Sequence, residues 1–289
     1  MPKKIKKKKY NKRNKKAKRS NNYKIILNMI LFVINILISL FFSKKNITPK
    51  RKIIKHNENE LLKEIPKFRS FSEYFEDLIL FTILSGIKNG FYIDIGAFDP
   101  NLVSVTKAFY LRGWNGINIE PLPNQFESFK KERPNDINLQ LVVGKKQENI
   151  TFYINGQCST AKEEYAGKAK KLNQTINIKM DTMENICKKY VPKGKEIDFC
   201  KIDVEGNERD VLLGYDFKNY KPKVFCIEST IPLTYIPNHQ LWEEILLNNS
   251  FTFVLQYKIN RYYVNNDFPE LLEITKKIRI YLKNKLHLN

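Results

Sequence analysis

The chain has 289 residues and a formal net charge of +21, from 51 Lys and Arg against 30 Asp and Glu. Residues 1–55 hold 19 of the basic residues and no acidic ones, so residues 56–289 carry 32 basic against 30 acidic side chains. A nucleic-acid-binding domain normally carries its basic excess on the folded part, which argues against that class. Four cysteines without zinc-ligand spacing and three histidines argue against a zinc knuckle or a histidine-rich metal site.

The N-terminal segment has the pattern of a membrane anchor with a basic tail. Residues 1–24 contain 13 Lys and Arg and are predicted to be disordered. Ile25–Phe42 contains no charged residue, a length at the short end for a transmembrane helix. The segment ends in Phe-Phe-Ser-Lys-Lys rather than in a small-residue cleavage site, which favours an uncleaved signal anchor over a cleaved signal peptide or a core helix.

The charges flanking this segment predict its orientation. Residues 43–55 carry six basic residues, fewer than the 13 that precede the span. By the positive-inside rule, the N-terminus faces the cytoplasm and the chain is a single-pass, type II membrane protein. Residues 43–59 are polar and basic and are predicted to be a linker, with one domain over 60–289.

This domain is predicted to alternate strands and helices. It begins with two short helices within 60–85, interrupted by Pro66. Strands are predicted over 91–95, 116–119, 137–143, 150–154, 175–179, 197–203 and 224–228, before a terminal hairpin of 251–256 and 260–264. Helices are predicted over 104–112, 125–132, 162–171, 182–190, 208–213, 240–247 and 270–285. Such alternation is typical of an α/β domain whose parallel sheet is covered on both faces.

Acidic residues stand at four predicted strand ends. Asp94 closes the first strand, just before Gly96, and Glu120 follows the second. The strand predicted over 197–203 ends in Asp203, followed by Val-Glu205-Gly, and the strand predicted over 224–228 ends in Glu228. Ligands of open α/β sheets bind outside these carboxyl ends, so the acids are expected to border one site.

The loop after the first strand discriminates between two nucleotide cofactors. A dinucleotide needs a glycine-rich turn that lets its pyrophosphate approach a helix N-terminus, whereas this loop offers only Gly96 and an acid, Asp99. S-adenosylmethionine has no phosphate and carries positive charge, so an acid-lined loop suits it better. Glu120, 26 residues after Asp94, could accept both ribose hydroxyls.

Several sequence blocks resemble the FkbM family of S-adenosylmethionine-dependent methyltransferases. The similarity runs from about Phe91 to Val264 and includes FYIDIGA, RGWNGINIEP, DFCKIDVEGNE, IESTIP and PNHQLW. The resemblance implies a Rossmann-like methyltransferase sheet whose last strand is antiparallel, and O-methylation of sugar or polyketide-type hydroxyls. Two departures are Pro100, where many methyltransferases have glycine, and Val143-Gly144, where an adenine-contacting acid is common.

Roles follow for individual residues. The residues predicted to bind S-adenosylmethionine are Asp94, Gly96, Ala97, Asp99 and Glu120. Asp203, Glu205 and His239 are predicted to act in catalysis, with His239 or a carboxylate removing the proton of the accepting hydroxyl. A metal held by Asp203 and Glu205 is possible but is not needed for this mechanism, and the predicted site includes none.

The predicted partners are a glycan or small-molecule hydroxyl acceptor and a membrane, contacted through Ile25–Phe42, with no nucleic acid. Two alternatives stay open. One is an inactive family member that serves as a binding or assembly module. The other is a nucleic-acid methyltransferase that uses the basic tail, which the nearly neutral domain disfavours.

Overall fold

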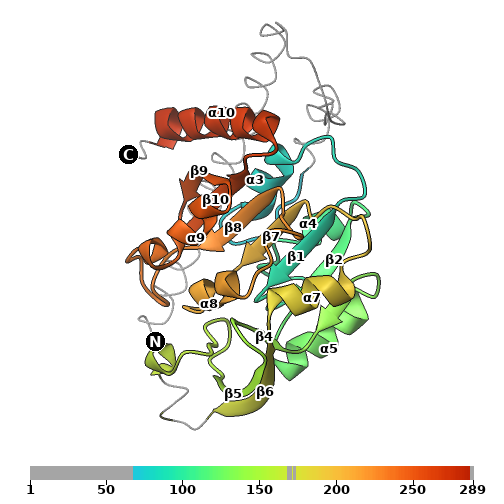
Figure 1. Ribbon diagram of the computed structural model, residues 1–289, viewed down its shortest axis with the longest axis vertical. Helices are drawn as coiled ribbons and strands as arrows, with labels where there is room; N and C mark the ends of the chain where they lie inside the picture. Colours follow the sequence, from blue (N-terminus) through green and yellow to red (C-terminus); the bar gives the residue numbers. More distant parts are fainter. Residues whose placement is uncertain (1–67, 168–170, 172–173, 287–289) are drawn as a thin grey trace, which may run out of the picture. The chain divides into compact units, whose positions relative to one another are not determined.

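The computed structural model describes residues 68–167, 171 and 174–286, and Arg69–Arg279 form one compact unit (Figure 1). The predicted basic tail, membrane span and linker lie outside the described residues, as does the first of the two helices expected within 60–85. Within the described ranges, no helix is both long enough and apolar enough to cross a bilayer.

A seven-stranded sheet forms the centre of the unit, in the order β3-β2-β1-β7-β8-β10-β9 (Figure 1). The parallel strands are β1 (Phe91–Ile95), β2 (Asn115–Ile119), β3 (Ile137–Leu139), β7 (Phe199–Ile202) and β8 (Val224–Glu228). The hairpin strands are β9 (Phe251–Tyr257) and β10 (Asn260–Asn265), and β10 pairs antiparallel with both β8 and β9. The predicted α/β fold with a mostly parallel sheet and an antiparallel last strand is confirmed.

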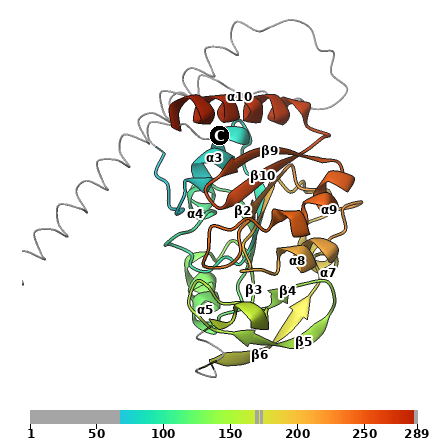
Figure 2. The ribbon, with the colours of Figure 1, turned by 90° about the vertical axis from the view of Figure 1, so that its left-hand side faces the viewer.

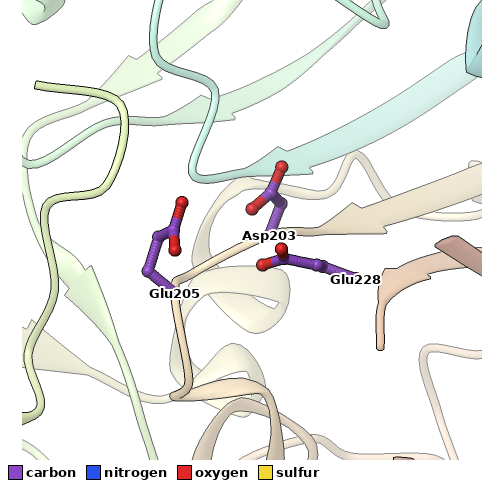
Figure 3. Close-up of side chains that lie close together, drawn as sticks. All are labelled: Asp203, Glu205 and Glu228. Atoms are coloured by element: carbon purple, nitrogen blue, oxygen red, sulfur yellow. The ribbon is translucent and has the colours of Figure 1, made fainter. Parts of the chain in front are cut away.

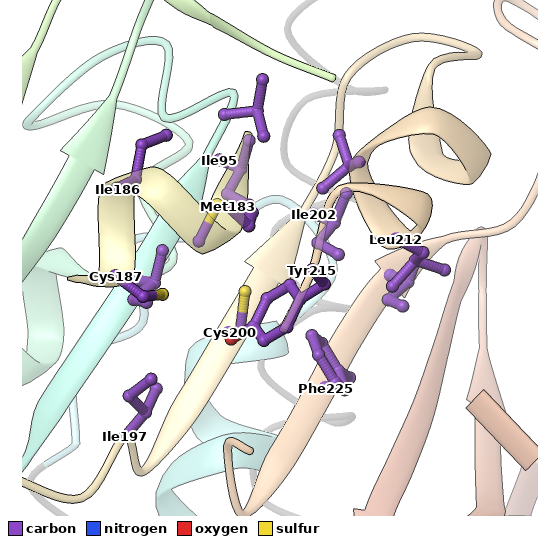
Figure 4. Close-up of a cluster of buried hydrophobic side chains, with 14 of the residues drawn as sticks. Ile95, Met183, Ile186, Cys187, Ile197, Cys200, Ile202, Leu212, Tyr215 and Phe225 are labelled. Atoms are coloured by element: carbon purple, nitrogen blue, oxygen red, sulfur yellow. The ribbon is translucent and has the colours of Figure 1, made fainter. Parts of the chain in front are cut away.

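Helices cover one face of this sheet through a continuous apolar core. These helices are α7 (Met183–Tyr190), α8 (Glu208–Leu213) and α9 (Glu243–Asn248). In α7, Met183, Ile186 and Cys187 recur at helical spacing and pack against strand residues such as Cys200 (Figure 4). Thr182 caps α7, since its side chain accepts a hydrogen bond from the backbone N–H of Asn185.

The opposite face of the sheet is packed by aromatic rings. Side chains alternate along a strand, so Tyr92 and Phe199 face away from the core of α7. Phe109 and Trp114 cover them, with a centroid distance of 4.8 Å between Phe109 and Phe199. Phe109 belongs to α4 (Lys107–Tyr110). The structure also describes the helices α3 (Glu76–Ile83), α5 (Pro123–Glu132) and α10 (Pro269–Leu286).

A three-stranded sheet lies at the end of the unit away from β9 and β10 (Figure 2). It contains β4 (Val142–Val143), β6 (Thr175–Asp181) and β5 (Glu148–Tyr153), and β5 and β6 pair antiparallel. The prediction of one strand over 137–143 is wrong, because β3 and β4 belong to different sheets. Val142 packs into a small core of this second sheet, whereas Val143 faces the main core.

Three helix predictions differ from the described structure. Residues 104–112 form only the four-residue α4, because the hydroxyls of Ser104 and Thr106 bond to Arg133 and Asp94 instead of capping a longer helix. The described part of 162–171 contains a short 3₁₀ turn, Glu163–Tyr165, and helical residues at 167 and 171, while 168–170 lie outside the described residues. Gln240–Leu247 splits into a 3₁₀ turn, His239–Leu241, and α9.

Candidate active site

A cavity of about 400 Å³ opens where the carboxyl ends of β1, β2, β7 and β8 meet. The sheet order runs outward in both directions from the β1–β7 pair, so the cavity lies at the switch point where α/β sheets bind ligands. Residues 156–159, between β5 and β6, and residues 233–235 form further walls. The strand-end acids predicted to share one site therefore do lie around one cavity, with the exceptions given below.

Gly96 lets two strand ends approach closely. Its φ is +74°, and a Cβ atom at this position would lie 1.8 Å from the backbone oxygen of Asp203. The backbone N–H of Asp203 also bonds to the carbonyl oxygen of Ile95 at 3.0 Å. A side chain at position 96 would thus separate the β1 and β7 ends, and only glycine fits there. The neighbouring Ala97 is buried and lines the cavity.

Asp94 lies beneath the cavity rather than in its wall. It is 1% exposed, accepts a hydrogen bond from the Thr106 hydroxyl at 3.2 Å, and does not line the cavity. The Lys201 ammonium is 3.5 Å from Asp94 and 3.3 Å from Asp203, and donates to the Gly96 carbonyl at 2.8 Å. Burial raises the pKa of Asp94, and Lys201 opposes that rise. Asp94 is placed to fix the loop through Lys201.

Glu120 lines the cavity at the end of β2. Its two oxygens accept hydrogen bonds from the backbone N–H groups of Phe98 and Leu122, at 2.7 and 2.8 Å. The side chain is 5% exposed, and burial raises its pKa to about 7. Each carboxylate oxygen keeps a second lone pair, so a ligand hydroxyl can still donate to it.

Three carboxylates approach one another on the β7 and β8 side of the cavity (Figure 3). Asp203 and Glu205 follow β7, Glu228 ends β8, and one oxygen of each lies within 4.8 Å of the others. Burial and the nearby Asp203 charge raise the pKa of Glu205 to about 8 and that of Glu228 well above its ordinary value. Close like charges in a partly dry site disfavour full ionisation of the cluster.

Besides Asp94, two further predicted site residues do not line the cavity. Asp99 accepts hydrogen bonds from the backbone N–H groups of Asn101 and Leu102, so its carboxylate caps a turn. His239 begins the short 3₁₀ turn, with its Nε2 atom 3.9 Å from Glu243, and it is not a lining residue. Burial and the charge of Arg261 lower the pKa of His239. The structure thus brings Asp203 and Glu205 together but does not bring His239 to them.

Lys201 was missed by the sequence reasoning, although a signal for it exists. It is a charged residue within an otherwise apolar strand that is buried along its whole length. Burial opposes its ionisation, but Asp203 and Asp94 raise its pKa above the ordinary lysine value. Cavity residues such as Cys158 and Tyr235 come from connecting segments and carry no periodic pattern.

Comparisons with known proteins found a family model and a solved structure that match the chain. A family model described as the methyltransferase FkbM domain matches residues 94–270. Among solved structures, the chain is similar to methyltransferase FkbM from Methylobacillus flagellatus KT, with 12% identity and a TM-score of 0.38. That similarity covers 71% of this chain and 60% of the other. No curated protein matches the sequence.

Proposed function

Because the chain belongs to the FkbM methyltransferase family, we propose that it methylates a hydroxyl oxygen, on a sugar or another small molecule, with S-adenosylmethionine as the donor. The observation that carries this proposal is that acids following β2 and β7 and at the end of β8 border one and the same cavity. An acid-lined cavity attracts a cationic ligand and disfavours phosphate.

The residues present fit S-adenosylmethionine. Gly96, which has a positive φ, is the only glycine in the loop after β1. A pyrophosphate cradle needs a glycine-rich turn, and one glycine does not provide it. Glu120 offers carboxylate oxygens toward the cavity, where they would hold ribose hydroxyls. Bound there, S-adenosylmethionine would supply an electrophilic methyl group on a sulfonium.

The remaining task of the protein is to place the accepting hydroxyl and take its proton. Asp203 lines the cavity and exposes 35% of its side chain, so an acceptor can reach its carboxylate. Glu205 lies beside it. Holding the reactants in contact accounts for most of the expected rate enhancement, and a proton acceptor adds ~10²–10⁴-fold.

Two measurements test this function on the full-length protein. Calorimetry should show binding of S-adenosylmethionine, and mass spectrometry should show a mass gain of one methyl group on hydroxyl acceptors from a panel of sugars and glycans. Failure to bind S-adenosylmethionine would overturn the proposal. Binding without transfer to any acceptor class would favour the inactive-module alternative, and transfer to RNA or DNA would favour the nucleic-acid alternative.

We also propose that Ile25–Phe42 anchors the chain in a membrane as a single span, with the N-terminus in the cytoplasm. The support is the uncharged run itself and the excess of basic residues before it. Protease treatment of sealed vesicles that carry a C-terminally tagged chain tests this directly. The proposed orientation places the domain and its tag inside the vesicle, so the tag should survive the protease. Degradation of the tag without detergent would contradict this orientation.

A further inference from the structure

The carboxylates of Asp203, Glu205 and Glu228 come from two adjacent strand ends and point toward one another (Figure 3). The ends of β7 and β8 are held in register, with Ile202 opposite Ile227, so the convergence is set by the sheet itself. All three residues line the cavity. The cluster therefore combines fixed backbone positions with access from the cavity.

The described residues do not neutralise or saturate this cluster. Among the described residues, one ion pair reaches the cluster, between the Lys201 ammonium and Asp203. The same ammonium also donates a hydrogen bond to the Gly96 carbonyl. Glu228 is 5% exposed, and its Oε2 atom is buried without a hydrogen-bond partner among the described residues. The same holds for Oε2 of Glu205. The Thr230 hydroxyl donates to Oε1 of Glu228 at 3.4 Å, so Oε2 is the atom without a partner, on a side chain that points into the cluster (Figure 3).

We propose that Asp203, Glu205 and Glu228 bind a divalent cation, of the Mg²⁺ or Mn²⁺ type, which in turn holds an oxygen of the acceptor in the cavity. The ligand set consists of carboxylate oxygens alone, and hard cations such as Mg²⁺ and Mn²⁺ prefer such ligands. Three carboxylates on one side of an ion leave positions for water or substrate oxygen. A cation also supplies the positive charge that the cluster lacks.

The cation site stands on the geometry of the cluster, whereas the role in holding the acceptor rests on the proposed function. An oxygen-rich acceptor such as a sugar can present a hydroxyl to the open positions of the ion. A bound divalent cation lowers the pKa of a hydroxyl group that it coordinates, which would assist loss of the hydroxyl proton.

The first experiment measures Mn²⁺ binding to the full-length protein by electron paramagnetic resonance, in the absence of S-adenosylmethionine. We expect one bound Mn²⁺ per chain, competed by Mg²⁺. Because Asp203 is partly exposed to the cavity, bound Mn²⁺ should also enhance the relaxation of water protons. Lack of Mn²⁺ binding would overturn the site, and bound Mn²⁺ without water access would overturn its role in holding an acceptor.

Variants connect the signal to these residues. Glu228→Gln removes one charge with almost no change in shape and should weaken Mn²⁺ binding at least ~tenfold, a loss seen even for outer-sphere partners of metals. Glu228→Asp keeps the charge and should bind more tightly than Glu228→Gln. The control is Glu184→Gln, at an exposed position of α7. It makes the same chemical change at a residue that does not line the cavity. Circular dichroism checks that each variant is folded.

Unchanged Mn²⁺ binding in folded Glu228→Gln and in Glu205→Gln would overturn the assignment. S-adenosylmethionine affinity, measured without added metal, separates this inference from the proposed function. A protein that binds S-adenosylmethionine but no Mn²⁺ contradicts only the cation site. A protein that binds Mn²⁺ but no S-adenosylmethionine contradicts only the proposed cofactor and, with it, the role of the ion in holding an acceptor.

Discussion

Glu120 is the individual residue whose environment predicts the clearest effect on cofactor binding. Glu120→Gln should weaken S-adenosylmethionine by removing charge-assisted hydrogen bonds of ~1.5–3 kcal/mol, roughly tenfold to a hundredfold. Burial raises the pKa of Glu120 to about 7, so wild-type affinity should also rise as the pH increases through that value and the carboxyl ionises. Calorimetry across this pH range on both proteins makes the comparison, and an equal affinity in both would remove Glu120 from the cofactor site.

Gly96 predicts a stability effect that a matched glycine can isolate. Gly96→Ala places a Cβ atom against the Asp203 carbonyl, in addition to the strain of a φ of +74°. Gly194→Ala has nearly the same strain, at φ +76°, but nothing lies within 4 Å of its Cβ position. The control should lose ~1–2 kcal/mol of unfolding free energy, and Gly96→Ala a further ~1–3 kcal/mol from crowding. Equal losses in urea denaturation would contradict the close approach of β1 and β7.

The strands β1 and β7 are also joined by charge, through Lys201 and Asp94. Both side chains are buried, so Lys201→Met should lower the free energy of unfolding by ~3–5 kcal/mol, because it leaves a buried carboxylate without its partner. Adding Asp94→Asn removes that carboxylate, and the double variant should be more stable than the sum of the two single losses predicts. Strictly additive losses in a double-mutant cycle would show that the two groups do not interact.

Strands and helices differ in how well the sequence predicted them. The bounds of β1, β8 and α8 agree with the predictions, since compact apolar runs or helical spacing define each of them. The split between β3 and β4 could not be predicted, because an apolar run does not reveal that neighbouring residues face two different cores. The same limit applies to the site: acids at strand ends were visible in the sequence, but the turn-capping of Asp99 depends on local backbone geometry.

His239 illustrates the limit of reasoning from residue type. A histidine near a strand end is chemically suited to remove a proton, so the sequence made His239 one candidate for the base, beside the carboxylates. In the fold, its neighbour Glu243 is occupied by Arg261 at 2.6 Å and by the Tyr263 hydroxyl at 2.8 Å. Only tertiary structure could show that this group of side chains does not line the cavity.

For the whole molecule, the cavity lies entirely within Arg69–Arg279, which form one compact unit. We therefore predict that a chain beginning at Asn57 stays soluble without detergent. It should bind S-adenosylmethionine about as tightly as the full-length chain, because every residue that lines the cavity is retained. Centrifugation and calorimetry check both expectations, and the shortened chain with Glu120→Gln serves as the control. Aggregation of the shortened chain, with the full-length chain soluble in plain buffer, would place Ile25–Phe42 in the core.

The insertion of β10 between β8 and β9 has a consequence for synthesis of the chain. Until Asn260–Asn265 leave the ribosome, the outer edge of β8 lacks its antiparallel partner, and an apolar edge with unpaired backbone groups invites aggregation. Asn260 pairs with Glu228, one ligand of the proposed cation site. Glu228 therefore gains its neighbour on this side only when β10 has been made. A nascent chain stopped before β10 would thus carry every residue that lines the cavity but lack the strand that completes the sheet around them.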